Sequence, residues 1–123
     1  MREILFRGKR IDNGEWVEGW YEMYPFWRWP LKASIIPSEK AKDGYYEHVE
    51  VDLSTVGQYT GLKDKNGKMI WEGDILALRN GIPRVVRFEN GTFVLENTSI
   101  PMRFANKFEV IGNVHDNPEL LEK

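Results

Sequence analysis

The sequence predicts a mainly β protein built from antiparallel hairpins, with a small barrel in its C-terminal half and one short helical turn at its end. Four Asn-Gly pairs occur in the 123 residues, at positions 13–14, 66–67, 80–81 and 90–91. Asn-Gly suits the tight turns that join antiparallel strands, because such turns need positive φ angles. The runs between these turns are short, and none of ordinary helix length repeats its apolar residues with a helical period. The pattern therefore favours repeated strand reversals over helices.

The middle hairpin, residues 57–71, organises the predicted fold. Two strand-like runs, 57–62 and 68–71, flank a polar turn that ends in Asn66-Gly67. Glu72-Gly73-Asp74 then interrupts the second run, and an apolar run restarts after it. Glycine adopts the backbone angles of a sharp corner more readily than any other residue. We therefore expect the chain to turn at Gly73 and the sheet to curl onto itself.

The N-terminal part predicts another hairpin, followed by a proline-rich segment and a strand. Residues 4–11 and 15–24 form the two arms of this hairpin. Residues 24–42 contain three prolines, which cannot donate to a sheet ladder, so we expect a loop or an edge segment there. Residues 45–53 alternate polar and apolar side chains, which predicts a half-buried strand.

The C-terminal part predicts a third hairpin. Residues 84–89 and 92–96 pair across the turn at Asn90-Gly91. This pairing sets two apolar side chains of each strand on a common face, Val86 and Phe88 opposite Phe93 and Leu95.

The remaining residues predict one more strand and a short helical end. Residues 97–106 are expected to be irregular, and residues 107–114 to form the last strand. Asparagine caps helices and proline suits their first position, so Asn117-Pro118 favours one helical turn over residues 118–122.

Length and composition narrow the class of protein. A chain of 123 residues is expected to be one domain, and if it divides, a hairpin lobe of residues 1–53 precedes a barrel of residues 54–117. The net charge of −2 gives no general footprint for duplex nucleic acid or an anionic membrane. The absence of cysteine excludes disulfides and cysteine metal clusters and fits a reducing compartment. Without a signal peptide or an apolar run near the roughly 20 residues of a membrane span, we expect a cytoplasmic protein with no membrane partner.

An aromatic segment in the proline-rich stretch is the candidate for partner binding. Phe26, Trp27 and Trp29 surround Arg28. These rings either have a structural role, capping an open end of the barrel or packing between lobes, which we prefer, or form an interface with a partner or a second copy of the chain, where Trp and Arg are enriched as anchors.

One strand face carries candidate metal ligands. His48, Glu50 and Asp52 alternate with apolar residues, which places an imidazole and two carboxylates on a single face. The alternative is the ordinary polar outer face of a soluble sheet, which we prefer, and we expect no bound metal or cofactor.

A basic set near the third hairpin is the candidate for nucleic-acid binding. Small β-barrels bind single strands with basic side chains and stacked aromatic rings. Here the basic residues are Arg79, Arg84 and Arg87, with Trp71 or Phe88 available for stacking. The acidic residues between them and the net charge make this function the less favoured one.

No catalytic constellation is recognisable. The two histidines, His48 and His115, sit in no nucleophile motif, and neither do the serines at positions 34, 38, 54 and 99. Glu72 and Asp74 flank Gly73 and could share acid–base work or a divalent ion. Asp74 is expected instead to bind backbone N–H groups of the turn. We therefore expect a protein that is not an enzyme.

The sequence resembles the YopX family of phage and prophage proteins. The resemblance rests on GQYTGLKDKNGKMIWEGDIL from Gly57, LFRGKRIDNGEWVEGW from Leu5, VRFENGTFVLEN from Val86 and FEVIGNVHDNPELL from Phe108. It implies a mostly β fold with an SH3-like C-terminal barrel, work in the host cytoplasm and a homo-oligomer, but no activity. Its motif residues supply the expected barrel core: Tyr59, Leu62, Ile70, Ile75, Leu76, Val86, Phe88, Phe93 and Ile111.

The expected function is that of a non-enzymatic phage accessory protein that binds another copy of itself or a phage or host protein. The first alternative is a nucleic-acid-binding small barrel, and the second is a metal-dependent enzyme that uses the face of His48.

Overall fold

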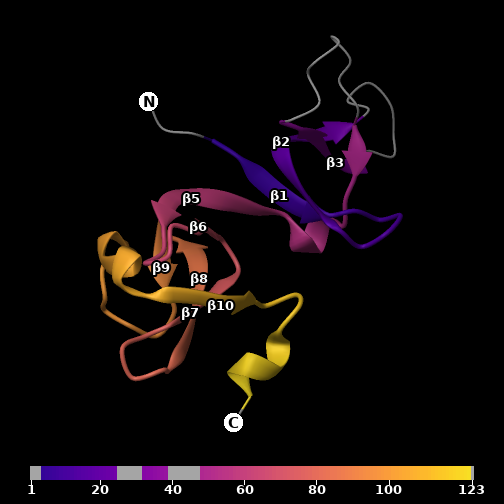
Figure 1. Ribbon diagram of the computed structural model, residues 1–123. Helices are drawn as coiled ribbons and strands as arrows, with labels where there is room; N and C mark the ends of the chain where they lie inside the picture. Colours follow the sequence, from indigo (N-terminus) through magenta and orange to yellow (C-terminus); the bar gives the residue numbers. More distant parts are fainter. Residues whose placement is uncertain (1–3, 25–31, 39–47, 123) are drawn as a thin grey trace. The chain divides into compact units, whose positions relative to one another are not determined.

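The computed structural model describes residues 4–24, 32–38 and 48–122, which fall into two compact units, Met1–Gln58 and Tyr59–Lys123. All strand pairs in these ranges are antiparallel (Figure 1). The prediction of a mainly β protein made of hairpins is confirmed. None of the helical segments within the described ranges has both the length and the apolar character that a membrane span requires.

Unit 1 is a sheet with the strand order β4-β3-β2-β1-β5. Its strands are β1 (Phe6–Lys9), β2 (Trp16–Tyr24), β3 (Lys32–Pro37), β4 (Val49–Glu50) and the start of β5 (Gly57–Lys63). The hairpin of β1 and β2 forms as predicted, from Phe6 opposite Gly19 to Lys9 opposite Trp16. One face of β2 packs on the core of this unit, with Val17, Tyr21 and Met23 against Ala33, Ile35 and Val51.

The prediction of a loop or an edge segment over residues 24–42 is wrong for β3. This strand pairs with β2 on one side and with β4 on the other, and its Ala33 and Ile35 are buried. Pro37 lies at the last position of the strand, where a missing N–H removes no bond from the middle of the ladder.

The second edge of β1 is covered by residues 50–58. Arg10 bridges to Val51, the carbonyl of Lys9 accepts from the N–H of Asp52 at 2.8 Å, and the N–H of Lys9 donates to Oγ1 of Thr55 at 2.9 Å. Gly57 then continues the pairing opposite Arg7. Between these contacts lies the short 3-10 helix η2 (Leu53–Thr55). The strand predicted to reach residue 53 therefore ends early, because Asp52 caps η2 by accepting from the N–H of Ser54.

Unit 2 contains the rest of β5 and five further strands. These are β6 (Met69–Trp71), β7 (Asp74–Ala77), β8 (Pro83–Glu89), β9 (Thr92–Leu95) and β10 (Glu109–Asn113). β5 pairs with β6, and the other four form a sheet in the order β10-β7-β8-β9. This arrangement is compatible with a small barrel, and the SH3-like class stays a prediction.

The corner at Gly73 and the turn at Asn90-Gly91, on which the prediction of the fold partly rested, form as expected. Gly73 has a φ of +90°, donates its N–H to Val86 and accepts from the N–H of Val114 at its carbonyl, so the chain does turn a corner there. Asn90 and Gly91 both have positive φ angles, as a tight hairpin turn requires. The resulting register sets Val86 opposite Leu95 and Phe88 opposite Phe93.

The core of unit 2 is largely the predicted one. Tyr59, Ile70, Ile75, Leu76 and Val86 are buried, and Leu62 and Phe93 are partly buried. Phe88 and Ile111 were wrongly assigned to the core, since they are 49% and 38% exposed. The register of β10 shifts between Val110 and Gly112, and this bulge leaves Val110 as the inward residue and Ile111 outside.

Short 3-10 helices complete this unit. η3 (Met102–Lys107) occupies residues that were predicted to be irregular and ends at Lys107, where the last strand was predicted to begin; its Ala105 is fully buried. η4 (Pro118–Leu121) is the predicted C-terminal turn. Asn117 occupies the N-cap position as predicted, but its side chain makes no capping hydrogen bond, because its oxygen accepts from the N–H of Asn113 at 3.2 Å instead.

Asp64 ties the middle hairpin to β10. Its Oδ1 accepts from the N–H groups of Asn66 and Lys68, and its Oδ2 accepts from the N–H of Val110, each at 2.9 Å. Burial raises the pKa of Asp64, but the hydrogen bonds from Val110, Lys68 and Asn66 outweigh it, so the pKa lies below its ordinary value of 3.8.

Unit 2 should lose stability in acid through Asp64. Because the pKa is lower in the folded than in the unfolded chain, the stabilisation is complete above pH 3.8 and is lost as the pH falls through the folded value. Urea unfolding from neutral pH to below pH 3.8 measures this loss. Asp64→Asn should flatten that dependence, and an equally steep curve in this variant would assign the acid sensitivity to other carboxylates.

Candidate functional site

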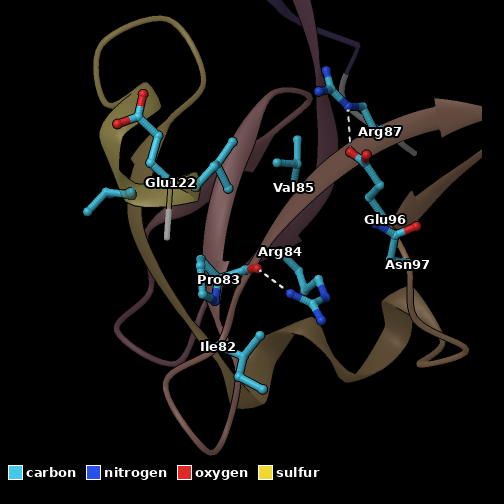
Figure 2. Close-up of a pocket in the computed structure, with 10 residues that line it drawn as sticks. Ile82, Pro83, Arg84, Val85, Arg87, Glu96, Asn97 and Glu122 are labelled. Atoms are coloured by element: carbon cyan, nitrogen blue, oxygen red, sulfur yellow. Dashed lines mark hydrogen bonds and ion pairs between the residues drawn. The ribbon is translucent and has the colours of Figure 1, made fainter.

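A pocket of about 640 Å³ in unit 2 is the candidate binding site (Figure 2). We call it the Arg84 pocket. Residues from the start of β8, the end of the third hairpin and η4 line it: Ile82, Pro83, Arg84, Val85, Arg87, Glu96, Asn97, Leu120, Leu121 and Glu122.

Local sequence signals position this lining. Pro83 begins β8, and Leu76 lies opposite Arg84 in the neighbouring strand. Successive residues of a strand point to opposite faces, so Arg84 leaves β8 on the face that carries the core residue Val86. Pro118 starts η4, which brings Leu120 and Leu121 to the pocket.

The two guanidinium groups of the pocket differ in their partners. Arg87 Nε donates to Glu96 Oε2 at 3.0 Å, and this pair is neutralised (Figure 2). Arg84 donates one hydrogen bond from Nη1 to the carbonyl of Pro83 at 2.8 Å, while its Nε is buried without a hydrogen-bond partner. Within the described ranges, no carboxylate forms an ion pair with Arg84.

The guanidinium of Arg84 is suited to bind a carboxylate of a ligand. A guanidinium presents a planar fork of donors that matches a carboxylate, and Arg84 is held in place by its bond to Pro83. Ile82 and Leu121 add apolar surface, being 39% and 40% exposed. The pocket can therefore take a ligand that combines a carboxylate with an apolar group.

The structure brings together two of the three arginines predicted for nucleic-acid binding. Arg84 and Arg87 share the Arg84 pocket, whereas Arg79 lines a different groove. Trp71 is 3% exposed and packs against Tyr59, so the prediction that it could stack on a base is wrong. Phe88 is exposed and meets Phe93 edge-on with ring centroids 5.0 Å apart.

The three candidate metal ligands have separate partners. His48 Nε2 lies 3.3 Å from Glu22 Oε2, Glu50 pairs with Lys32 at 3.7 Å, and Asp52 caps η2. Among the residues that the structure describes, no group of three His, Asp or Glu side chains is placed to hold a metal ion.

The turn carboxylate Asp74 has the structural role expected of it. It is 2% exposed, and its Oδ2 accepts from the N–H of Trp71 at 2.8 Å. The aromatic candidates for partner binding, Phe26, Trp27, Arg28 and Trp29, lie outside the described residues.

Of the residues that line the Arg84 pocket, only Arg84 and Arg87 were singled out from the sequence. Its acidic and apolar residues, among them Glu96, Leu120 and Leu121, were missed. The only local signal was the predicted C-terminal turn, which carries two leucines but does not say which strand they face.

Comparisons with known proteins give a family and a fold. The family model described as YopX protein matches residues 5–122. Among solved structures, the chain is similar to protein EF1440 from Enterococcus faecalis, with 24% identity and a TM-score of 0.64, over 99% of this chain and 100% of that chain. At this identity the likeness shows a shared fold alone. No curated protein matches the chain.

Proposed function

Because this chain belongs to the YopX family of phage-type proteins, we propose that it is a non-enzymatic binding module whose Arg84 pocket receives a segment of a partner protein. The proposal includes a phage or prophage origin and the cytoplasm of the bacterial host as the place of action. The observation that carries it is the guanidinium of Arg84, held beside apolar side chains and without a carboxylate partner.

The mixed charge of the pocket favours protein over nucleic acid. Glu96 and Glu122 line it together with the two arginines, and a phosphate chain would meet their repulsion. A protein segment with one Asp or Glu beside an apolar residue satisfies both parts of the pocket. Its carboxylate binds Arg84, and its apolar side chain packs on Ile82 and Leu121.

The partner we propose is a different protein, encoded by the phage or its host. A second copy of the chain is the other possible occupant, because a two-fold axis pairs different residues of the same patch and could set Arg84 of one copy against Glu122 of the other. Static light scattering tests this point. A mass of two chains that returns to one chain in Arg84→Gln would identify a second copy as the occupant and would overturn the choice of a different protein.

Arg84→Gln should weaken peptide binding by about tenfold or more, since a hydrogen bond to a charged group contributes about 1.5–3 kcal/mol. The probe is a set of peptides selected on the wild-type protein from a random displayed library. We expect them to share an acidic residue next to an apolar one. Isothermal titration calorimetry of each selected peptide measures the loss.

Arg79→Gln is the matched control, because it removes an exposed arginine of the same unit that does not line the pocket. Its peptide affinities should equal those of the wild type, and thermal unfolding should show that both variants fold. Selected peptides without an acidic residue, or equal losses in the two variants, would contradict the proposal.

A further inference from the structure

A second groove in unit 2 has a different character from the Arg84 pocket. It has a volume of about 480 Å³ and lies between the loop of residues 78–81 and η3. Leu78, Ile100 and Phe108 form an apolar floor that packs on the core. Phe104 also lines it and is 36% exposed. We call it the Phe104 groove.

Cations surround the aromatic ring of this groove. The guanidinium carbon of Arg103 lies 4.7 Å from the centroid of the Phe104 ring, and Nζ of Lys107 lies 5.3 Å from it. Both distances are within the range of cation–π attraction, which holds these two side chains over the ring. Lys107 lines the groove, whereas Arg103 lines a neighbouring pocket. Arg79 adds a third, exposed cation. In contrast to the Arg84 pocket, no Asp or Glu is among the described residues that line this groove.

We infer that the Phe104 groove binds a short stretch of single-stranded nucleic acid. Phosphates pair with Arg79 and Lys107, which line the groove, and with Arg103, which contacts the Phe104 ring from a neighbouring pocket. An unpaired base packs on the apolar floor and on the part of Phe104 that the two cations leave exposed. An acidic peptide with an apolar side chain also combines these two features, but a nucleotide strand supplies one phosphate per unit to the neighbouring cations, and no carboxylate among the described lining residues repels it. A duplex offers no unpaired base to the groove, because its bases stay stacked inside the double helix. The net charge of −2 restricts the site to a few nucleotides, because the rest of the surface does not attract a longer backbone.

Fluorescence anisotropy with a labelled oligothymidine about ten nucleotides long tests the inference. Binding should weaken as KCl rises from about 50 to 200 mM, with a log–log slope near −2 for three phosphate contacts on a single strand. Phe104→Ala should reduce the affinity about tenfold, as expected for the loss of one base–aromatic stack. Lys107→Gln, an exposed change that leaves the core intact, should make the salt slope shallower by roughly one unit or less.

Matched controls separate this site from its surroundings. Phe88→Ala removes another exposed phenylalanine, and Lys63→Gln removes another exposed lysine of the same unit. Both should bind the oligonucleotide like the wild type. Arg84→Gln should also leave oligonucleotide binding unchanged, so this inference and the proposed peptide site can fail separately.

Four results would overturn the inference. The first is no binding of the oligothymidine in low salt, and the second is an unchanged affinity in both Phe104→Ala and Lys107→Gln. The third is an equal affinity for a duplex or for thymidine monophosphate. The fourth is displacement of the oligonucleotide by poly-glutamate as effectively as by unlabelled oligothymidine. The last result would identify an acidic protein as the occupant.

Discussion

Gly19→Ala should destabilise unit 1 by roughly 3 kcal/mol or more, because overpacking against backbone cannot be relieved by a side-chain rotation. A Cβ atom at this position would lie 1.9 Å from the carbonyl oxygen of Ile36 and 2.8 Å from its carbonyl carbon. Gly19 is buried in β2 between Phe6 of β1 and Pro37 of β3. Strands β2 and β3 would have to separate to admit one methyl group.

Urea unfolding, with hydrogen exchange at the amides of β2 and β3, measures this effect. Gly14→Ala is the control from the same unit. Gly14 has a φ of +72° and nothing within 4 Å of its added Cβ, so only the backbone conformation is penalised. That penalty is about 1–2 kcal/mol. Equal losses in the two variants would show that β2 and β3 accommodate the methyl group and that the steric argument is wrong.

Asp64→Ala should destabilise unit 2 by about 3 kcal/mol, because it removes three hydrogen bonds to a charged acceptor and leaves the buried N–H of Val110 unpaired. The N–H groups of Asn66, Lys68 and Val110 lose their acceptor together. Asp64 itself is 5% exposed, so the cavity that alanine leaves is shielded from bulk water. Asp64→Asn keeps the size of the side chain and one acceptor oxygen, and its loss should be intermediate.

Asp12→Ala is the matched control, since it is an aspartate beside the Asn-Gly turn of the first hairpin. Its side chain is 64% exposed and pairs with Arg10 at 2.8 Å. Exposed ion pairs contribute about 0–1 kcal/mol, so little stability should be lost. Hydrogen exchange should accelerate at Lys68 and Val110 in Asp64→Ala alone. Protection of these amides equal to that of the wild type would show that another group accepts their hydrogen bonds.

The parts of the fold that the sequence predicted are those fixed by neighbouring residues. The turn at Asn90-Gly91 joins strands two residues apart, so the turn itself sets Val86 opposite Leu95. The position of β3 depends on a partner strand that the pattern of prolines cannot specify. In β10 a bulge makes Val110 the inward residue, so Ile111, which the family resemblance assigned to the core, lies outside.

The candidate sites also combine residues that the sequence pointed to with residues that only the folded structure brings near them. Arg84 and Arg87 were predicted, together with Arg79, as basic residues near the third hairpin. Part of the apolar lining of their pocket comes from Leu121, which only η4 places there. The Phe104 groove joins Arg79 to Lys107, and no local pattern links a turn residue to a 3-10 helix that the sequence did not predict.

The long-range hydrogen bonds that complete the two units have a consequence for the order of folding during synthesis. Lys9 binds Thr55 in the first unit and Asp64 binds Val110 in the second, and each pair is 46 positions apart. Neither hydrogen bond can form until the later of its two residues has left the ribosome. The ribosome adds about 5–20 residues per second. The N-terminal unit can therefore close several seconds before the ribosome supplies β10, and nascent chains long enough for Gln58 to have left the ribosome should already protect the amide of Lys9.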